Sequence, residues 1–386
     1  MLQFGDLRDK IPEAVGLLLG LHSLYLVAVW FALRHSPPRW LVAVGAIAFR
    51  LTLAPQAPSL SDDLYRYSFE GQVQSMGANP YAVRPADPPW NAIAHQRTPG
   101  ADFRAVYGPL TELTQWAAWR WPKVPAMLAD LVVLLLLARW MPGRWLIYAW
   151  SPLPVLEFWG QGHNDALVVL FLVLALYGRE NWAGMWLGWA AAVKWWPLAL
   201  LAAFQRQGRV QWRDYVLAPA VVLVLLAWYL PGLQWTSAQF LSGFLGGWRN
   251  NDSVYGLLLG LVGDVYRAKY LAFALFAAAS LLLRQPLWVV VAMLAVSANV
   301  HPWYLSWLLP FLVRQPVPGL MLWIALMPLA YETVIWWHTL GLWTQSPEVR
   351  YWIYLPVAAV LVASWWLRPS LRKTGPRLTS HAGTLE

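Results

Sequence analysis

Two adjacent carboxylates open the most polar stretch of an otherwise apolar chain. Asp62 and Asp63 follow directly on an apolar segment that ends in LTLAPQAPSL. A carboxylate held beside a hydroxyl can remove its proton, and general base catalysis of this kind contributes about 10²–10⁴-fold to a rate. The same two residues could instead cap a helix, because Ser-Asp-Asp before an amphipathic run is ordinary N-cap chemistry. The residues alone leave both interpretations open.

Further polar side chains recur at the ends of later apolar segments. Ionisable groups inside or at the edge of a membrane are costly, so they are candidates for function by default. A face that combines acids and cations could bind an anionic lipid headgroup and activate a hydroxyl beside it. These residues are Glu157, His163, Asn164, Asp165, Lys194, Arg249, Asn250, Asn251, Asp252, His301, Tyr304 and Glu332.

Each of these residues also has a purely structural interpretation. His163 and Asp165 could cap the next helix, and His301 could be an ordinary buried histidine before a proline. Lys194 could extend its ammonium group to the membrane interface and do nothing else. No pair of these residues has metal-ligand spacing such as HExxH, so the sequence requires no metal, although a divalent cation stays possible.

Composition indicates a membrane protein with several spans. Of 386 residues, 59% are hydrophobic and only 12% are charged, which cannot form an ordinary soluble surface. The 29 tryptophans gather near the ends of apolar runs, as expected for rings at the headgroup region. The chain has no cysteine, which excludes disulfides and thiolate chemistry. The net charge of +9 belongs to loops, and no nucleic-acid-binding patch is visible.

About thirteen apolar segments lie between residues 13 and 367, and several are too short to cross a bilayer of about 30 Å as lipid-exposed helices. Short segments are tolerated when they are buried in a bundle or line a cavity. The shortest pair is interrupted at Lys194–Pro197, which predicts a hairpin. We expect the tip of this hairpin to reach the face that carries the polar stretch 59–110, called the polar island below.

The polar island is predicted to begin with a helix that lies along the membrane interface. Tyr65, Arg66 and Glu70 fall at spacings that give this helix an aromatic face and a charged face. The segment Gly77–Tyr81 should end the helix, because glycine and asparagine tolerate positive φ and proline cannot continue the helix. A proline-rich loop then returns through Tyr107-Gly108-Pro109-Leu110 to an amphipathic segment.

Basic residues predict the orientation of the chain. Arginines and lysines fall on alternate connections, including the cluster 206–213 and the tail 368–386, and basic loops stay in the cytoplasm. This places the polar island, the loop 234–253 and the N-terminus outside the cytoplasm, in the inner (plasma) membrane. The tail 368–386 is polar, and we expect it to be cytoplasmic and disordered.

Five motifs in order resemble the bacterial mannosyltransferase-like branch of the GT-C glycosyltransferases, across about residues 59 to 314. The motifs are SDDLYRYSFEGQVQSMGANPY, VYGPL, PLPVLEFWGQGHNDALVVL, LGWAAAVKWWPLALL and HPWYLSWLLP. The pattern D-L-x-x-Y of that family fits Asp63, which the resemblance implies to be the catalytic base, with Asp62 as the alternative. Where this chain reads Tyr107-Gly108-Pro109-Leu110, members of that family often read Y-P-P-L. Some of them have a metal-binding Glu before that motif, but this chain has Val106 in that place.

The resemblance implies an all-α bundle of about 11–13 transmembrane helices within a single domain, residues 1–367, whose loop 59–121 is catalytic and extracytoplasmic. It also implies an inverting transfer of a hexose, mannose first, from a polyprenyl-phosphate donor to a hydroxyl of a lipid or glycan acceptor. We expect donor-phosphate binding by Lys194, Arg249, His301 and Arg66. The residues expected to contact the substrates are Tyr67, Glu70, Asn79, Tyr81, Tyr107, Glu157, His163, Asn164, Asp165, Trp303 and Tyr304.

A transporter or flippase of lipid-linked sugars is the alternative function. Such a protein would also carry charges near broken helices. It should have polar groups near the midplane and a path to both sides, whereas this sequence concentrates its polar groups at one face.

Overall fold

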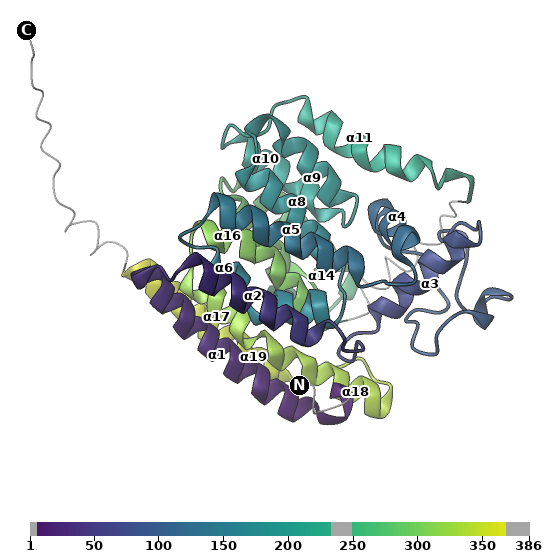
Figure 1. Ribbon diagram of the computed structural model, residues 1–386, viewed down its shortest axis with the longest axis horizontal. Helices are drawn as coiled ribbons and strands as arrows, with labels where there is room; N and C mark the ends of the chain where they lie inside the picture. The colour runs from purple at the N-terminus through teal and green to yellow at the C-terminus, as the bar shows by residue number, and fades with distance from the viewer. Residues whose placement is uncertain (1–5, 233–248, 368–386) are drawn as a thin grey trace, which may run out of the picture.

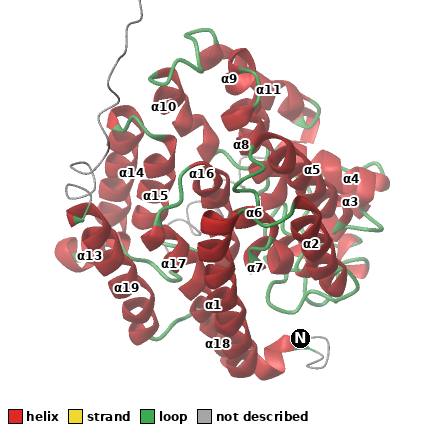
Figure 2. Cartoon of the chain, turned by 60° about the vertical axis from the view of Figure 1, so that its left-hand side comes forward, coloured by secondary structure: helices red, strands yellow, loops and turns green. Residues whose placement is uncertain are grey.

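The computed structural model describes residues 6–232 and 249–367, which are helices joined by loops (Figure 2). This confirms the predicted all-α class. Within the described residues the only β-type pairing is a single bridge between Asn250 and Asn299. The predicted tail 368–386 and most of the predicted outer loop 234–253 lie outside the described residues.

Four stretches of the described chain are long and apolar enough to cross a membrane. They are Leu7–His35, Val265–Leu282, Pro318–Leu340 and Pro347–Trp366. The first contains α1 (Ile11–His35), the second is α14, the third contains α17 (Pro318–Leu326) and α18 (Glu332–Leu340), and the last is α19. In Figure 1, α1, α17 and α19 run together along one side of the molecule. These lengths and compositions support a multi-pass membrane protein.

The other apolar segments form shorter helices that surround the core. They are α2 (Arg39–Leu53), α5 (Val124–Trp140), α8 (Asp165–Tyr177), α9 (Ala183–Ala191), α10 (Leu201–Gln205), α11 (Asp214–Ala227), α13 (Val254–Val262) and α15 (Pro286–Val296). α8 packs between α5 and α9, and α9 packs on α11. The last contact depends on small residues, because a Cβ at Gly188 would lie 2.7 Å from the carbonyl oxygen of Ala218.

Two predicted apolar segments are interrupted rather than continuous. Residues 144–160 form α6 (Leu146–Ala149), a single turn α7 (Pro152–Pro154) and a π-helical stretch, Val155–Gly160. Residues 302–314 form the 3₁₀ segment η8 (Pro302–Leu308) and α16 (Leu309–Arg314). Prolines at the start of α7, η8 and α16 remove backbone donors, which favours a change of helix type. Such irregular backbone is tolerated in a membrane protein where protein surrounds it.

A buried ion pair fastens the first interrupted segment to its neighbours. The Arg50 Nε donates to the Asp130 Oδ2 at 2.5 Å, and neither side chain is exposed to solvent. Asp130 also accepts from the Tyr148 hydroxyl at 2.6 Å and from the Trp159 Nε1 at 2.8 Å. Because every group is paired, the network fixes how α2, α5 and residues 148–159 lie against one another.

The polar island contains α3 (Asp63–Ser75), the short η3 (Trp90–Ala92) and α4 (Pro109–Ala118). α3 ends where the sequence predicts, and Gly77 takes a φ of +83°. α3 and α4 lie side by side, away from α1 and α19 (Figure 1). The prediction that α3 has an exposed charged face is wrong. Arg66 and Glu70 are buried instead of facing water. The charged pair therefore belongs to the packing of the polar island.

Candidate active site

The interruptions between helices bring the predicted polar residues together. The tip between α9 and η6 (Trp196–Leu200) meets the start of α4, where the Gly108 N–H donates to the Val193 carbonyl at 3.2 Å. Leu110 donates to the Ala192 carbonyl at 3.0 Å. A Cβ at Gly108 would lie 2.1 Å from the Ala192 oxygen, so only glycine fits here. The prediction that the hairpin tip reaches the polar island is confirmed. We call the region where the tip meets the start of α4 the junction.

Asp63 is the first residue of α3 and points into this junction. About 27% of its side chain is exposed, and its Oδ2 lies 3.6 Å from the His163 Nδ1. The nearby Tyr107 hydroxyl favours the ionised form of the same carboxylate and lowers its pKa. Burial raises the pKa of Asp63 to about 6, and the Lys194 ammonium opposes that rise. The group is therefore a carboxylate at neutral pH and a stronger base than an exposed aspartate.

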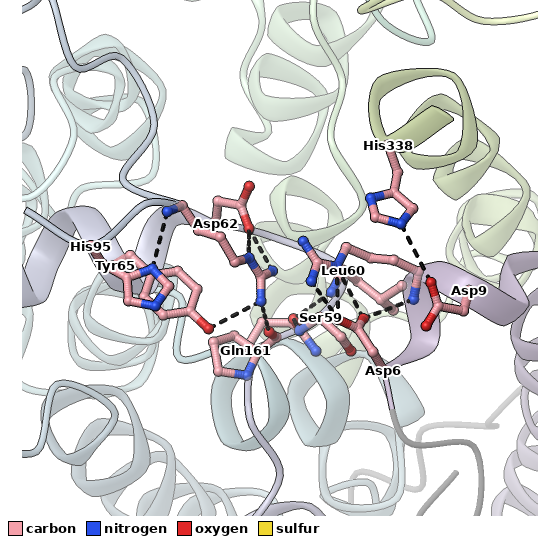
Figure 3. A network of polar contacts seen from close by, with 12 residues as sticks. Asp6, Asp9, Ser59, Leu60, Asp62, Tyr65, His95, Gln161 and His338 are labelled. Carbon is pink, nitrogen blue, oxygen red and sulfur yellow. Dashed lines mark hydrogen bonds and ion pairs between the residues drawn. The ribbon is translucent and has the colours of Figure 1, made fainter. Parts of the chain in front are cut away.

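Asp62 points elsewhere and forms a second network (Figure 3). Its Oδ1 accepts from the Arg97 Nε at 2.8 Å, and Arg97 also donates to the Pro58 carbonyl and the Tyr65 hydroxyl, both at 3.0 Å. The Tyr65 ring stacks on His95 with centroids 4.1 Å apart. Asp62 occupies the N-cap position, but its side chain accepts no helix N–H. The capping interpretation therefore fails for Asp62, which braces the loop instead.

His163 connects Asp63 to a column of buried side chains. Its Nε2 lies 3.3 Å from the Glu157 Oε2, and the Tyr331 hydroxyl donates to the other oxygen of Glu157. His163 stacks on Trp303 with centroids 3.9 Å apart, and Trp303 stacks on His301 at 4.5 Å. His163 does not cap α8, whose N-cap residue is Asn164. It forms the back wall behind the Asp63 carboxylate.

Lys194 lies in a polar and aromatic pocket, within range for its charge to act on Asp63. Its Nζ is 3.0 Å from both carboxylate oxygens of Asp165, and Asp165 also accepts from the Trp307 Nε1 at 2.8 Å. The same ammonium lies 4.7 Å from the centre of the Tyr304 ring and 5.3 Å from that of Trp307. Asp165 is fully buried, whereas the Lys194 side chain is 19% exposed. An anchored, partly accessible cation does not fit the interpretation of Lys194 as a free interfacial lysine.

The remaining predicted substrate residues form a layer behind this pocket. Tyr67 and Tyr107 contact each other edge to face at 4.8 Å, and the Asn164 Nδ2 donates to the Thr111 hydroxyl at 2.9 Å. The Tyr81 hydroxyl donates to the Tyr107 carbonyl at 2.6 Å. The Asn79 Nδ2 donates to the Tyr229 carbonyl at 2.7 Å, so Asn79 and Tyr81 hold the loop in place.

The structure separates the four cations that we expected at one phosphate. The Arg66 Nε donates to Glu70 at 2.5 Å, and the rest of its guanidinium group donates to the carbonyls of Pro99, Gly100 and Phe103. Arg66 is thus a structural residue, and Glu70 is its partner. Both side chains are almost fully buried and paired with each other, so this arrangement does not support either expected role.

Arg249 and His301 also differ from expectation. Arg249 pairs with Asp252, which pairs in turn with Arg350, in a separate cavity. Burial, followed by the nearby Lys194 charge, lowers the pKa of His301 to about 3. A neutral imidazole adds no positive charge to a phosphate site, so among the four expected cations Lys194 is the one whose charge acts on Asp63.

Several residues of the site were not predicted from the sequence. They are Arg97, Thr111, Glu112, Trp307 and Tyr331. Trp307 could have been found, because it follows Trp303 by one helical turn in PWYLSW. Arg97 lies in a loop, Thr111 and Glu112 lie in α4, and Tyr331 directly precedes α18. Nothing in the local sequence marks their partners.

Two further observations complete the description of the site. In the parts of the chain that the structure describes, no three His, Asp or Glu side chains converge as metal ligands. Comparisons of the chain with protein-family models, with curated proteins and with solved structures find no match.

Proposed function

We propose that this protein is an integral-membrane inverting glycosyltransferase. It would move a hexose, mannose first, from a polyprenyl-phosphate donor to an extracytoplasmic hydroxyl of a lipid or glycan. The observation that carries the proposal is the pair of charged groups at the junction. A partly exposed carboxylate with a raised pKa, Asp63, lies within electrostatic range of an anchored ammonium group, Lys194, although the two come from widely separated parts of the chain.

Asp63 is the general base in this mechanism. The acceptor hydroxyl gives its proton to the Asp63 carboxylate while its oxygen forms a bond to the anomeric carbon of the donor. The bond from that carbon to the phosphate oxygen breaks, and the lipid phosphate leaves with the electron pair. A pKa of about 6 suits this role, because the group is ionised at neutral pH yet binds a proton more strongly than an ordinary aspartate.

Lys194 stabilises the phosphate that departs. Its ammonium group has three donors, and Asp165 together with the rings of Tyr304 and Trp307 fixes its position. A cation held in place before the reaction stabilises developing charge without reorganisation. A base and a phosphate on opposite sides of the anomeric carbon give inversion, so a β-linked donor would yield an α-linked product.

The finer architecture belongs to the same proposal. We propose a GT-C-like bundle of about 11–13 crossings in the inner membrane, with the junction on the extracytoplasmic side. The interrupted helices α6, α7, η6 and η8 support it, because short segments that are buried in protein can line a groove for a long lipid tail.

The test is transfer in detergent, where no compartments exist. Purified full-length protein is incubated with polyprenyl-phosphate mannose, glucose or arabinose carrying a radiolabel, and with membrane lipid or glycan extract as acceptor. We expect one donor to be consumed and its sugar to appear on the acceptor. Asp63→Asn should lower the rate about 10²–10⁴-fold, while Asp62→Asn is the matched control and should cost far less.

Two outcomes would contradict the proposal. Normal turnover by Asp63→Asn, on protein that still binds donor, would remove Asp63 as the base. Binding of all donors without consumption by the wild-type protein, followed by their movement across reconstituted vesicles, would favour the flippase instead.

A further inference from the structure

A second polar cavity lies near the junction but does not include Asp63 or Lys194. Its volume is about 230 Å³. It is formed by the segment after the undescribed residues 233–248, by the loop before α19 and by the first turns of α19. The lining residues are Arg249, Asn251, Asp252, Trp343, Thr344, Gln345 and Arg350.

This cavity carries an excess of positive charge. Asp252 is almost fully buried, and it accepts from the Arg249 Nη2 at 2.5 Å and from the Arg350 Nη1 at 2.7 Å. One carboxylate thus orients two guanidinium groups, whose side chains stay 36% and 27% exposed. Each guanidinium has five N–H donors, so several of them remain for a ligand. The three charges sum to +1 at the cavity wall.

Amide groups at the same cavity also lack partners. The Gln345 Oε1 accepts from the Asn251 backbone N–H at 2.9 Å, but the Gln345 Nε2 is buried with no partner among the described residues. Asn251 has a positive φ of 53°, a conformation that asparagine tolerates, and its Oδ1 also has no partner among the described residues. An unpaired buried donor is costly, so a ligand whose oxygen accepts from the Gln345 Nε2 would be favoured.

The cavity is connected to the candidate active site by rings. Trp343 lies 5.8 Å from His301, which stacks on Trp303, and Trp303 stacks on His163 beside Asp63. A ligand held at this cavity would therefore lie at the far end of the ring column from the base.

We propose that this cavity is a phosphate-binding subsite, separate from Lys194, that takes the phosphate of a second ligand. Two arginines oriented by one carboxylate, with an unpartnered amide donor beside them, match the oxygen-rich and negatively charged surface of a phosphate. The binding of phosphate here does not require a glycosyl transfer. The further statement that the second ligand is the acceptor, a phosphate-bearing lipid, rests on the proposed function.

The test measures binding to purified full-length protein in detergent, in a Lys194→Ala/Asp165→Asn background, so that the donor site does not contribute and no buried carboxylate is left unpaired. The probes are inorganic phosphate, short-chain phosphatidic acid, and the diacylglycerol with the same tails but no phosphate. We expect phosphatidic acid to bind and diacylglycerol not to bind. Equal binding of inorganic phosphate would identify free phosphate as the ligand, and preference for phosphatidic acid would identify a lipid headgroup.

Variants of the cavity decide whether it is the site. Arg350→Gln should weaken phosphate binding about ten- to hundredfold, whereas Arg350→Lys should retain part of it. Asp252→Asn removes the competing anion and should strengthen binding. The matched control is Arg84→Gln, which breaks an exposed arginine–aspartate pair elsewhere and should change nothing.

Three results would overturn the proposal. These are no binding of any phosphate probe, binding that Arg350→Gln and Asp252→Asn leave unchanged in folded protein, and equal binding of diacylglycerol. Failure of sugar transfer in the earlier experiment would not affect this test, because binding is measured without a donor.

Discussion

At the scale of single residues, two adjacent aspartates take different tasks because a helix turns between them. Asp62 pairs with Arg97 on the outside of the loop, whereas Asp63 faces His163 and the Lys194 pocket. Side chains of consecutive helical residues diverge by about 100°, so one location cannot serve both. Substitutions of the two residues should therefore change the stability of the protein in opposite directions and by different amounts.

We expect Asp63→Asn to stabilise the protein while it removes activity. Burial raises the pKa of Asp63 in the folded state from 3.8 to about 6, so the folded protein binds this proton more tightly than the unfolded chain does. Stability attributable to this group therefore falls as the pH rises from about 4 to about 6, and the loss stays complete above that range. Asparagine carries no such cost. Melting temperatures measured from pH 4 to pH 8 should diverge in favour of Asp63→Asn.

Asp62→Asn is the control for that prediction. It weakens the partly exposed pair with Arg97 and should lower the melting temperature slightly. If Asp63→Asn melted below the wild type at pH 7, Asp63 would be a structural residue and the base assignment would lose its support.

Lys194 should control donor use. A charge-assisted contact to phosphate is worth about 1.5–3 kcal/mol, so Lys194→Ala should weaken donor use by about one to two powers of ten. That substitution also leaves Asp165 buried without its cation, which destabilises a protein by itself. The double variant Lys194→Ala/Asp165→Asn removes both charges and restores folding.

The donor KM and kcat of both variants are then compared with wild type. A defect that persists in the folded double variant belongs to phosphate binding. Recovery of wild-type kinetics in the double variant would mean that Lys194 only neutralises Asp165.

At the scale of elements, α3 and α4 are joined by a buried pair of carboxyl groups. Glu112 of α4 and Glu70 of α3 are buried close enough for each carboxyl group to affect the pKa of the other, and Arg66 pairs with Glu70. A Cβ at Gly71 would lie 2.3 Å from the Gln115 oxygen, so the two helices touch through their backbones. Burial, and then the neighbouring Glu70, raise the pKa of Glu112 well above its usual value. Glu112 therefore keeps its proton to a higher pH than an exposed glutamate does.

Glu112→Gln should make the protein more stable at alkaline pH. Above about pH 4.5 the unfolded chain releases the Glu112 proton while the folded protein keeps it, so wild-type stability falls with rising pH through this window. Glutamine keeps a donor toward Glu70 and has no proton to lose. Denaturation at pH 5 and pH 8 should therefore show a stability difference that grows with pH in favour of the variant. A constant difference would mean that the folded protein does not hold the Glu112 proton more tightly than the unfolded chain does.

The limits of α3 could be predicted from sequence, but its surroundings could not. Gly77 and Pro80 end the helix through local backbone chemistry, which the sequence states directly. Arg66 and Glu70 lie four residues apart, which is also typical of a solvent-exposed helix face. Only the packing of α4 and of residues 99–103 over them decides that the pair is buried. Long-range packing has no signal in a single segment.

The candidate site could also be predicted only in part. The hairpin break at Lys194–Pro197 and the polar residues of EFWGQGHNDAL mark the junction, because polar groups at the ends of apolar segments need partners. The positive charge of a side chain did not show which of the cations lie in one pocket. Arg66 and Arg249 find their carboxylates in Glu70 and Asp252, within four residues of each, and only Lys194 reaches the junction.

At the scale of the whole molecule, the two ends of α8 have different surroundings. Lys194 pairs with Asp165 at the N-terminus of α8, whereas Arg209 donates to the carbonyls of Ala175 and Gly178 at its C-terminal end. Thirteen helical residues separate these ends by about 20 Å. Arg144 donates to the Arg314 carbonyl, and Arg314 closes α16. A basic end and a candidate active site thus lie at opposite ends of the core.

This arrangement predicts which connections face the cytoplasm. Basic connections stay in the cytoplasm, so we expect the loop 206–213 inside and the polar island outside. The chain has no cysteine, and Gln96 and Gln207 are both exposed, so single cysteines can be placed at either position. In intact cells, an impermeant maleimide should label Gln96→Cys and should label Gln207→Cys only after the membrane is opened. Labelling of Gln207→Cys alone in intact cells would reverse the orientation and place Asp63 on the cytoplasmic side.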